Sequence, residues 1–151
     1  MNLEARAPHL WTYLPLDRHE VRSVVAAMCA LLAVKTGAAA ALPELIITDD
    51  TGSEECNCAH LDCPGPTNIL SFPLAAQRGS SSGVLGSLVL SVTVLRRECL
   101  LYGQDPGEHC LRLLAHGLAH LAGLEHGRKM WELCAGLEKE GRRALTSRRQ
   151  A

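Results

Sequence analysis

The sequence predicts a single domain built from both helices and strands. Its 151 residues, 47% hydrophobic and 21% charged, suit one globular domain with a core of ordinary size, so we expect residues 1–151 to fold together. Segments with apolar residues at helical spacing are interspersed with short runs rich in Val, Ile and Leu, which are typical of strands. The longest apolar run, 24–34, is too short to cross a bilayer, so we expect no membrane partner.

Cysteine usage indicates a reducing compartment. The chain has seven cysteines, an odd number, and no convincing secretory signal precedes them. We therefore expect reduced thiols and a cytoplasmic protein.

The first two elements are expected to be a short strand and a long helix. The strand covers 9–14 and ends at Pro15, and Asp17 can cap the helix that follows. The helix should run over 18–35, because its apolar residues recur at helical spacing and Gly37 is a natural C-terminal stop.

Three further strands are expected. A buried strand at 44–48 contains the triplet LII, and the segment TNILSFPL at 67–74 predicts a strand ended by Pro73. VLGSLVLSV at 84–92 predicts a neighbouring strand, and the Gly/Ser stretch at 79–83 predicts a flexible connection to it.

Helices are expected between and after these strands, at about 53–60, 93–102 and 106–122, and then from the region of Met130 to about Glu140.

Charge is uneven along the chain. Residues 1–127 hold 8 basic and 13 acidic side chains, net −5, whereas 128–151 hold 7 and 3, net +4. The segment 142–151 is therefore expected to be a flexible basic tail, either facing an anionic partner or simply solvated.

Residues 105–127, DPGEHCLRLLAHGLAHLAGLEHG, contain three histidines in the pattern H-x-x-x-H-x-x-G-x-x-H. Asp105 can cap a helix that begins at Pro106. At about 100° per residue, His116 and His120 then lie one turn apart on one face. Two imidazoles at this spacing can bind one metal ion.

The third histidine can reach the same point through a turn. Gly123 can take up a left-handed conformation that ends the helix, and the chain then turns His126 back toward the other two. Three unrelated histidines are the alternative, but this spacing and the glycine at the bend favour a metal site. Three neutral imidazoles that leave one position open are typical of catalytic zinc, so we expect one Zn²⁺ per chain, held by His116, His120 and His126.

Two other interpretations of these motifs are less favoured. Zinc proteases with two helical histidines place a glutamate after the first, and here that residue is Gly117, so a small metalloprotease would lack its general base. The cluster Cys56, Cys58 and Cys63, with His60 and Asp62, has no paired C-x-x-C, so we do not expect a second metal site there.

The segments TNILSFP, LGSLVLS and HGLAHLAGLEH, in this order, resemble the YbeY family of rRNA maturation factors and metal-dependent endoribonucleases. The likeness covers about residues 44–130. It implies an α+β fold with a small mixed sheet of about four strands, packed helices and a zinc-binding cleft, with zinc ligation by His116, His120 and His126. It also implies cytoplasmic work on ribosomal RNA or a ribosomal subunit, chiefly end maturation and ribosome quality control.

Three positions depart from the family pattern. The usual arginine six residues before the threonine of TNILSFP is Leu61, and no lysine or arginine occurs between Lys35 and Arg78 to replace it. The usual aspartate of the G-D-I strand is Ser87, and the aspartate before the third histidine is Glu125. The metal motif is therefore better preserved than the residues around it.

Candidates for catalysis and substrate binding follow from these positions. Arg112, one helical turn before the first zinc ligand, is a candidate phosphate contact, and Glu125 is a candidate to orient a ligand or handle a proton. Asn68 and Ser71 are further candidates for substrate binding. His109 shares the face of Arg112 but lies about 10 Å from the first ligand, too far to bind the same ion. Solvated surface charges are the alternative for Arg112 and Glu125.

Two functional hypotheses remain from different classes. The first is a zinc-dependent endoribonuclease, in which the ion acts as a Lewis acid or lowers the pKa of water for phosphodiester cleavage. The second is a non-catalytic, zinc-containing ribosome assembly factor, which the replacements at Leu61 and Ser87 favour.

Overall fold

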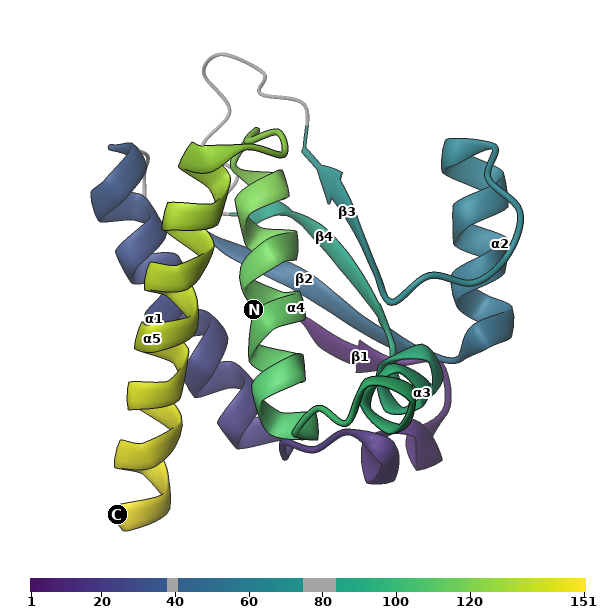
Figure 1. The fold of residues 1–151 in the computed structure, drawn as a ribbon, viewed down its shortest axis with the longest axis horizontal. Coiled ribbons are helices and arrows are strands. Elements are labelled where there is room, and N and C mark those ends of the chain that lie inside the picture. The colour runs from purple at the N-terminus through teal and green to yellow at the C-terminus, as the bar shows by residue number, and fades with distance from the viewer. Residues whose placement is uncertain (38–40, 75–83) are drawn as a thin grey trace.

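Four strands form one mixed sheet with the order β1-β2-β4-β3 (Figure 1). β1 pairs parallel with β2, β2 pairs parallel with β4, and β3 pairs antiparallel with β4. The computed structural model describes residues 1–37, 41–74 and 84–151. The strands are β1 (Leu3–Ala5), β2 (Leu42–Thr48), β3 (Ile69–Pro73) and β4 (Val84–Ser91). This arrangement confirms the predicted small mixed sheet of an α+β domain.

The described residues also form one 3₁₀-helix and five α-helices. α4 packs against β3 and β4 and against α5, which in turn packs against α1. α2 lies at the opposite side of the molecule from α1 and α5 (Figure 1). The helices are η1 (Pro8–Tyr13), α1 (Arg18–Thr36), α2 (Asp50–Leu61), α3 (Val92–Tyr102), α4 (Pro106–Leu121) and α5 (Arg128–Gln150).

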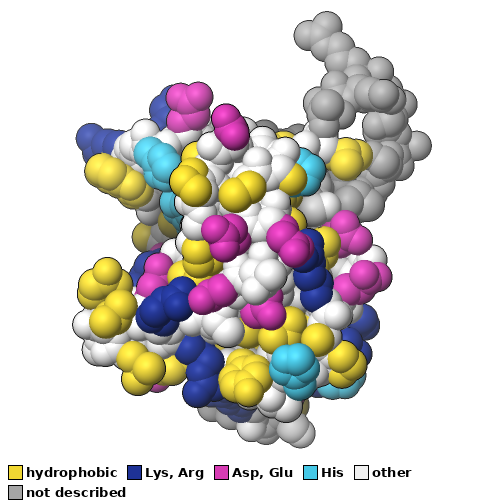
Figure 2. All heavy atoms as spheres, turned by 90° about the vertical axis from the view of Figure 1, so that its right-hand side faces the viewer, with side chains coloured by type: hydrophobic (Ala, Val, Ile, Leu, Met, Phe, Trp, Pro, Cys, Tyr) yellow, Lys and Arg dark blue, Asp and Glu magenta, His cyan; other side chains and the backbone are white. Residues whose placement is uncertain are grey.

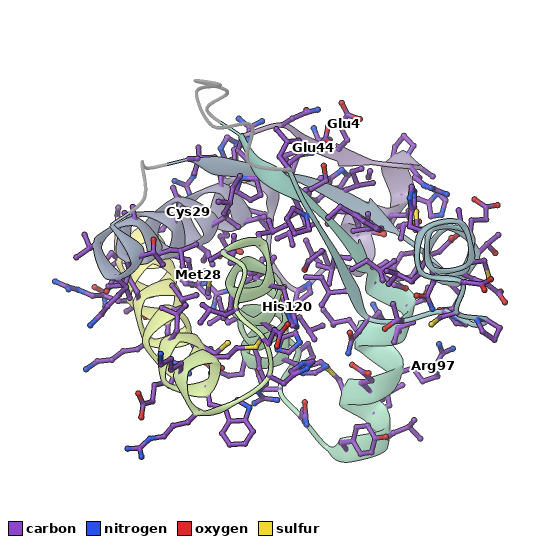
Figure 3. The ribbon with its side chains drawn as sticks, turned by 90° about the horizontal axis from the view of Figure 1, so that it is seen from above. Glu4, Met28, Cys29, Glu44, Arg97 and His120 are labelled. Carbon is purple, nitrogen blue, oxygen red and sulfur yellow. The ribbon has the colours of Figure 1, made fainter. Side chains whose placement is uncertain are left out.

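One face of the sheet packs into the hydrophobic core, whereas the other face is only partly covered. Leu45 and Leu88, on neighbouring strands, are fully buried in the core beneath the helices. Seen from above, Glu4 and Glu44 lie on the side of the sheet away from these helices (Figure 3). Because successive side chains of a strand point to opposite faces, α4 can contact only one of these two sets.

The residues predicted to begin and end α1 are confirmed. The Asp17 carboxylate accepts hydrogen bonds from the backbone of His19 and Glu20, and Glu20 returns a bond to the Asp17 backbone, which completes a capping box. Gly37 adopts the left-handed conformation, with φ of 69°, and ends the helix. These local signals explain why the predicted and observed bounds of this helix agree within one residue.

The strand expected at 9–14 is wrong. Pro8–Tyr13 is a 3₁₀-helix, and the first strand is Leu3–Ala5. Pro8 suits the first position of a helix because it has no N–H to donate. β1 exists because Leu3 pairs with Leu45, forty-two residues away, and no local pattern reports such a contact.

Three other boundaries differ from prediction or are not described. α2 starts at Asp50 rather than near residue 53, because the Asp49 carboxylate accepts from the N–H of Gly52. α5 continues to Gln150 rather than ending near residue 140, so most of the segment expected as a flexible tail, 142–151, is helical. The expected connection at 79–83 lies outside the described residues. No helix in the described ranges combines the length and apolar character needed to cross a membrane.

Candidate metal centre

Helix α4 presents the histidines because its opposite face is fixed in the core. Leu111, Leu114 and Leu118 are buried, with at most 1% of each exposed. The Asp105 carboxylate accepts from the N–H of Glu108 at 2.9 Å and caps the first turn. A capped helix with a buried apolar stripe has no freedom to rotate, so its remaining faces have fixed directions.

Gly117 allows the close approach of α4 to the sheet. A Cβ atom at this position would lie 2.8 Å from Cδ2 of Leu88 and 2.9 Å from Cδ1 of Ile69. Ser71 adds a hydrogen bond from its hydroxyl to the Gly117 carbonyl, at 3.1 Å. The residue that follows the first histidine is therefore a packing position against β3 and β4, with no room for a catalytic side chain.

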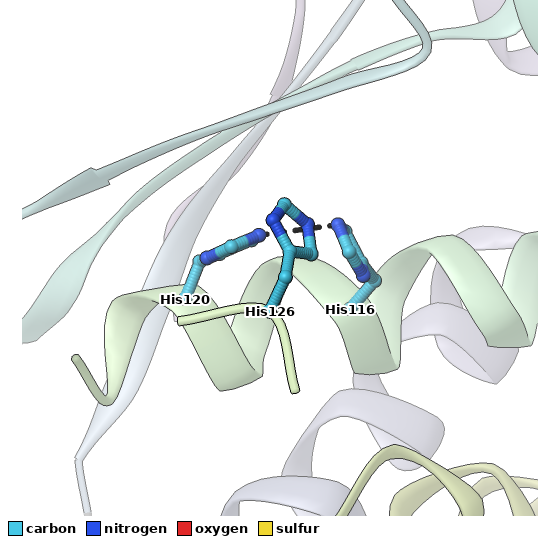
Figure 4. Close-up of side chains that lie close together, drawn as sticks. All are labelled: His116, His120 and His126. Carbon is cyan, nitrogen blue, oxygen red and sulfur yellow. Dashed lines mark hydrogen bonds between the residues drawn. The ribbon is translucent and has the colours of Figure 1, made fainter. Parts of the chain in front are cut away.

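The three predicted histidines converge (Figure 4). The ring centroids of His116 and His120 are 4.6 Å apart, those of His116 and His126 are 5.3 Å apart, and those of His120 and His126 are 4.8 Å apart. One ligating nitrogen from each ring lies within 4.8 Å of the other two. His116 and His120 are half-buried and His126 is exposed, so the cluster opens to solvent on one side.

The carbonyl of Leu124 orients His120. It lies 3.0 Å from Nδ1 of His120, and because a carbonyl can only accept, Nδ1 carries the hydrogen. Nε2 then presents its lone pair toward Nε2 of His116, 3.1 Å away. Fixing a histidine through its second nitrogen is the usual way in which proteins prepare a metal ligand. The sequence contained no signal for this contact, since every residue has a carbonyl.

Gly123 makes the turn as predicted. Its φ is 81°, in the left-handed region, and its N–H donates to the carbonyl of His120 at 2.9 Å. The N–H of Leu124 then donates to the carbonyl of Ala119 at 3.1 Å. These two bonds reverse the chain within one helical turn and return His126 to the end of α4.

The protonation of His116 also suits a ligand. Burial lowers the pKa of His116 below the usual histidine value, and the neighbouring rings of His120 and His126 lower it further. A neutral imidazole at neutral pH is the form that binds a metal. Three such donors with an open side suit Zn²⁺ and related divalent transition metals. The donor set therefore fits a metal ion.

No second group of this kind occurs among the described residues. Cys56 accepts a hydrogen bond from Arg6, whereas the thiol of Cys58 lies against the backbone carbonyl of Cys63. These cysteines do not converge with His60, whose ring contacts Phe72. These side chains are therefore not arranged around one common point in the described structure.

Comparison with known proteins assigns the chain to a family. A family model described as endoribonuclease YbeY matches residues 12–143. The chain belongs to the YbeY family. The endoribonuclease YbeY of Nitratidesulfovibrio vulgaris is 43% identical over 155 residues, covering 91% of this chain and 90% of that protein. The endoribonuclease YbeY of Oleidesulfovibrio alaskensis is 44% identical over 138 residues, covering 79% of each.

A solved structure has the same fold. The solution structure of a Thermotoga maritima protein superimposes with a TM-score of 0.60 at 17% identity, covering 97% of this chain and 92% of that one. This likeness concerns the fold alone.

Asn68 and Arg112 belong to one polar network that the sequence did not reveal. The Glu98 carboxylate accepts from Nδ2 of Asn68 at 3.0 and 3.2 Å and lies 2.7 Å from Nε2 of His109. Nη1 of Arg112 lies 3.4 Å from Nδ1 of His109 and donates to Gln104 at 3.0 Å. Because a guanidinium only donates, His109 accepts at Nδ1 and donates from Nε2 to Glu98.

The network explains the burial of His109, which is only 7% exposed. A buried imidazole requires partners for both nitrogens, and Glu98 and Arg112 supply them. Glu98 is the functional candidate that sequence reasoning missed, because it lies on α3, between the β3 and α4 motifs in space but in neither of them. The Arg112 guanidinium is held toward the N-terminal half of α4, one turn or more from the histidine cluster.

The other candidates have simpler environments. Ser71 is engaged with the backbone of α4, so its hydroxyl is already used in packing. Glu125 is exposed in the turn before His126 and forms no hydrogen bond with any described residue.

The departures from the YbeY pattern have different consequences. Leu61, at the arginine position, is 53% exposed at the end of α2. Ser87 donates to Glu44 at 3.0 Å on the solvent-facing side of the sheet, whereas its neighbour Leu88 packs near α4. The change at Ser87 is therefore separated from α4 by the sheet.

Proposed function

We propose that this protein is a zinc-dependent endoribonuclease of the cytoplasm that acts on ribosomal RNA, in rRNA maturation and ribosome quality control. The observation that carries the proposal is the convergence of His116, His120 and His126 at the open end of α4, in a chain of the YbeY family. Its relatives in Nitratidesulfovibrio vulgaris and Oleidesulfovibrio alaskensis are named endoribonuclease YbeY.

The residues of the site have distinct parts in this proposal. The three histidines would hold zinc, and zinc when bound would supply a Lewis acid for a phosphodiester and lower the pKa of water. Arg112 offers an exposed guanidinium to a phosphate next to the scissile one. Glu125 offers a carboxylate that can accept a proton at the open side. Asn68 would meet the RNA in an orientation set in advance by Glu98.

A ribosome assembly factor that binds zinc without cleaving RNA is the second candidate. Leu61 favours it, because an exposed leucine stands where the family places a cation. The described part of the chain between Lys35 and β4 contains no lysine or arginine to replace that cation. A metalloprotease is disfavoured, because Gly117 packs against Leu88 and Ile69 and leaves no space for a glutamate base.

One experiment separates these functions. Cleavage of a single labelled single-stranded RNA and of an unstructured peptide is measured for wild type, His126→Ala and the exposed-histidine control His19→Ala, with chelator and after zinc is returned. We expect RNA cleavage that requires zinc, survives in His19→Ala and disappears in His126→Ala, with no peptide cleavage. Equal RNA cleavage by wild type and His126→Ala would contradict the nuclease.

Two further variants address the missing arginine. Leu61→Arg and Arg112→Ala, each matched to wild type for bound zinc, are compared on the same RNA. We expect Leu61→Arg to raise cleavage and Arg112→Ala to lower it. If zinc-loaded wild type and Leu61→Arg both leave RNA intact while the protein still binds ribosomal subunits, the assembly factor is the better description.

A further inference from the structure

The C-terminal end of α2 holds two exposed cysteines that the metal site does not use. Cys58 lies in the last turns of α2, and Cys63 follows the helix by two residues. Both are free and exposed. They are close to Leu61, but this inference is independent of the proposed nuclease function.

The backbone brings the two cysteines together. Asp62 adopts the left-handed conformation, with φ of 52° and ψ of 32°, and reverses the chain at the helix end. The N–H of Cys63 then donates to the carbonyl of Asn57 at 3.4 Å. As a result, Sγ of Cys58 lies 3.3 Å from the carbonyl oxygen of Cys63. The Cys58 thiol therefore rests on the backbone of the residue that carries the other thiol.

The segment after Cys63 is tied to α2 at two more points. Nδ2 of Asn57 donates a hydrogen bond to the carbonyl of Gly65 at 2.9 Å. The hydroxyl of Ser53 donates to the carbonyl of Thr67 at 2.7 Å and accepts from the N–H of Thr67 at 3.0 Å. Neither tie restrains the Cys63 side chain, which remains exposed. The loop is thus held near α2 while its thiol is free to rotate toward Cys58.

The other thiols are less accessible to an oxidant than Cys58 and Cys63. Burial raises the pKa of Cys29 to about 11 and that of Cys110 to about 12, so both stay protonated and shielded. Cys99 is also buried. Cys56 is half-buried and its sulfur accepts a hydrogen bond from Nη2 of Arg6 at 3.3 Å. Cys134 is half-buried, and burial raises its pKa. Burial therefore separates the remaining cysteines from the exposed pair.

We propose that Cys58 and Cys63 form a reversible dithiol–disulfide pair, a modification site that a peroxide oxidises. Each thiol first ionises and releases a proton. One thiolate attacks hydrogen peroxide, an S–O bond forms as the O–O bond breaks, and the departing hydroxide takes up one of these protons to become water. The second thiolate attacks the resulting sulfenic sulfur, the S–S bond forms as the S–O bond breaks, and the departing hydroxide takes up the other proton to become a second water. The two sulfurs lose two electrons in total, which reduce one peroxide to two waters.

The structural consequence is a covalent tie between the end of α2 and the segment that enters β3. In the reduced protein the 3.4 Å backbone bond from Cys63 to Asn57 is the weakest of the three ties. The disulfide reinforces that tie. We therefore expect amide hydrogen exchange at residues 58–65 to slow on oxidation, while exchange in α4 and α5 stays unchanged.

The test uses the full chain, treated with hydrogen peroxide and then with an alkylating reagent. Before alkylation, the intact mass should fall by two hydrogen atoms, and dithiothreitol should restore it. After alkylation, the oxidised protein should carry two fewer adducts than the reduced protein. Proteolysis on the amino side of Asp62 separates Cys58 from Cys63, so the disulfide appears as two peptides joined until reduction. The matched variants are Cys58→Ser, Cys63→Ser and, as a control, Cys56→Ser, each checked for folding by circular dichroism.

The expected result is that wild type and Cys56→Ser form the same cross-link, whereas Cys58→Ser and Cys63→Ser do not. A cross-link that survives in Cys58→Ser and is lost in Cys56→Ser would overturn the assignment. So would disulfides only between chains, or oxygen addition at single cysteines with no loss of hydrogen in wild type.

Discussion

Two glycines on either side of His120 act on the metal centre through different physics. Gly117 is required for space, because any side chain would meet Leu88 and Ile69 in the core. Gly123 has open space around its Cα and is required for conformation, because its φ is 81°. A left-handed residue with a side chain costs about 1–2 kcal/mol. The first glycine therefore affects packing, and the second affects the position of the third ligand.

Changing Gly123→Val should weaken zinc binding about as much as loss of a ligand, because relief of the strained φ moves Leu124 and His126 together. Gly123→Asn should retain most of the affinity, since asparagine tolerates the left-handed conformation. Affinity is measured by competition with a chromogenic chelator. Gly103→Val is the matched control: Gly103 is also left-handed, with φ of 61°, but it ends α3 and supports no ligand. Equal loss of zinc in Gly103→Val would refute this account of the bend.

The lowered pKa of His116 favours zinc binding at mildly acidic pH. Protons compete with the metal for the imidazole, and because burial lowers this pKa, the neutral form persists to lower pH than in an exposed histidine. Zinc per chain should stay constant down to about pH 6.5, the ordinary histidine pKa, and fall below it. Equilibrium dialysis against a zinc buffer across pH measures this. Half of the zinc lost already above neutral pH would contradict it, and His19→Ala should follow the wild-type curve.

At the scale of elements, Glu98 joins three parts of the fold at one point. Its carboxylate, 25% exposed, accepts from Asn68 at the start of β3 and from His109 on α4, while Glu98 itself lies on α3. A carboxylate is the residue type that can accept from two donors at once. The position of Asn68 relative to the metal helix therefore depends on this side chain.

Glu98→Gln should destabilise the protein by about 1–3 kcal/mol. The amide nitrogen of the new glutamine can only donate, so it would face the donor of either Asn68 or His109 and leave that donor without an acceptor. RNA cleavage should fall as well, with bound zinc unchanged, because Asn68 loses its orientation. Chemical denaturation and the labelled-RNA assay measure the two effects. Glu132→Gln is the control: Glu132 pairs with Arg128 in an exposed ion pair, so its loss should stay within about 0.5 kcal/mol. Additive effects of Glu98→Gln and Asn68→Ala would show that the two residues are not coupled.

For the whole molecule, the basic C-terminal segment does not surround the metal centre. α5 begins next to His126 and runs away from it for 23 residues, so its last turns lie on the order of 30 Å from the histidines. There Arg149 pairs with Glu20 at 2.8 Å, which joins the end of α5 to α1. On the face that contains α2, acidic and basic side chains are interspersed (Figure 2). RNA would therefore be held by a few local cations.

The salt dependence of RNA cleavage should accordingly be shallow. Each phosphate contact with a single strand contributes a slope of roughly −0.7 in log affinity against log salt. Arg112→Ala should reduce the slope of log kcat/KM by about that amount, whereas Arg149→Ala should leave it unchanged because Arg149 is remote from the site. Kinetics at several salt concentrations test both variants. A steep wild-type slope that Arg149→Ala reduces would place the RNA along α5.

The sequence alone predicted the group of three histidines that could hold a metal ion, and the elements that carry them. His116, His120, Gly123 and His126 lie within eleven residues, and helical geometry with one left-handed glycine fixes their relative positions. The bounds of α1 were predictable for the same reason, since its cap and its terminating glycine act on adjacent residues. Such features depend on short-range geometry, which residue type and spacing describe well.

Tertiary structure alone decided what those elements meet. β1 forms by pairing with β2, Glu98 bridges β3 and α4, and the far end of α5 is held by Glu20 of α1. Sequence patterns also could not show that Ser87 faces away from the metal helix or that the Leu124 carbonyl orients His120. Each of these depends on which segments pack together or on a backbone atom that every residue has, so no residue type at a given spacing could report it.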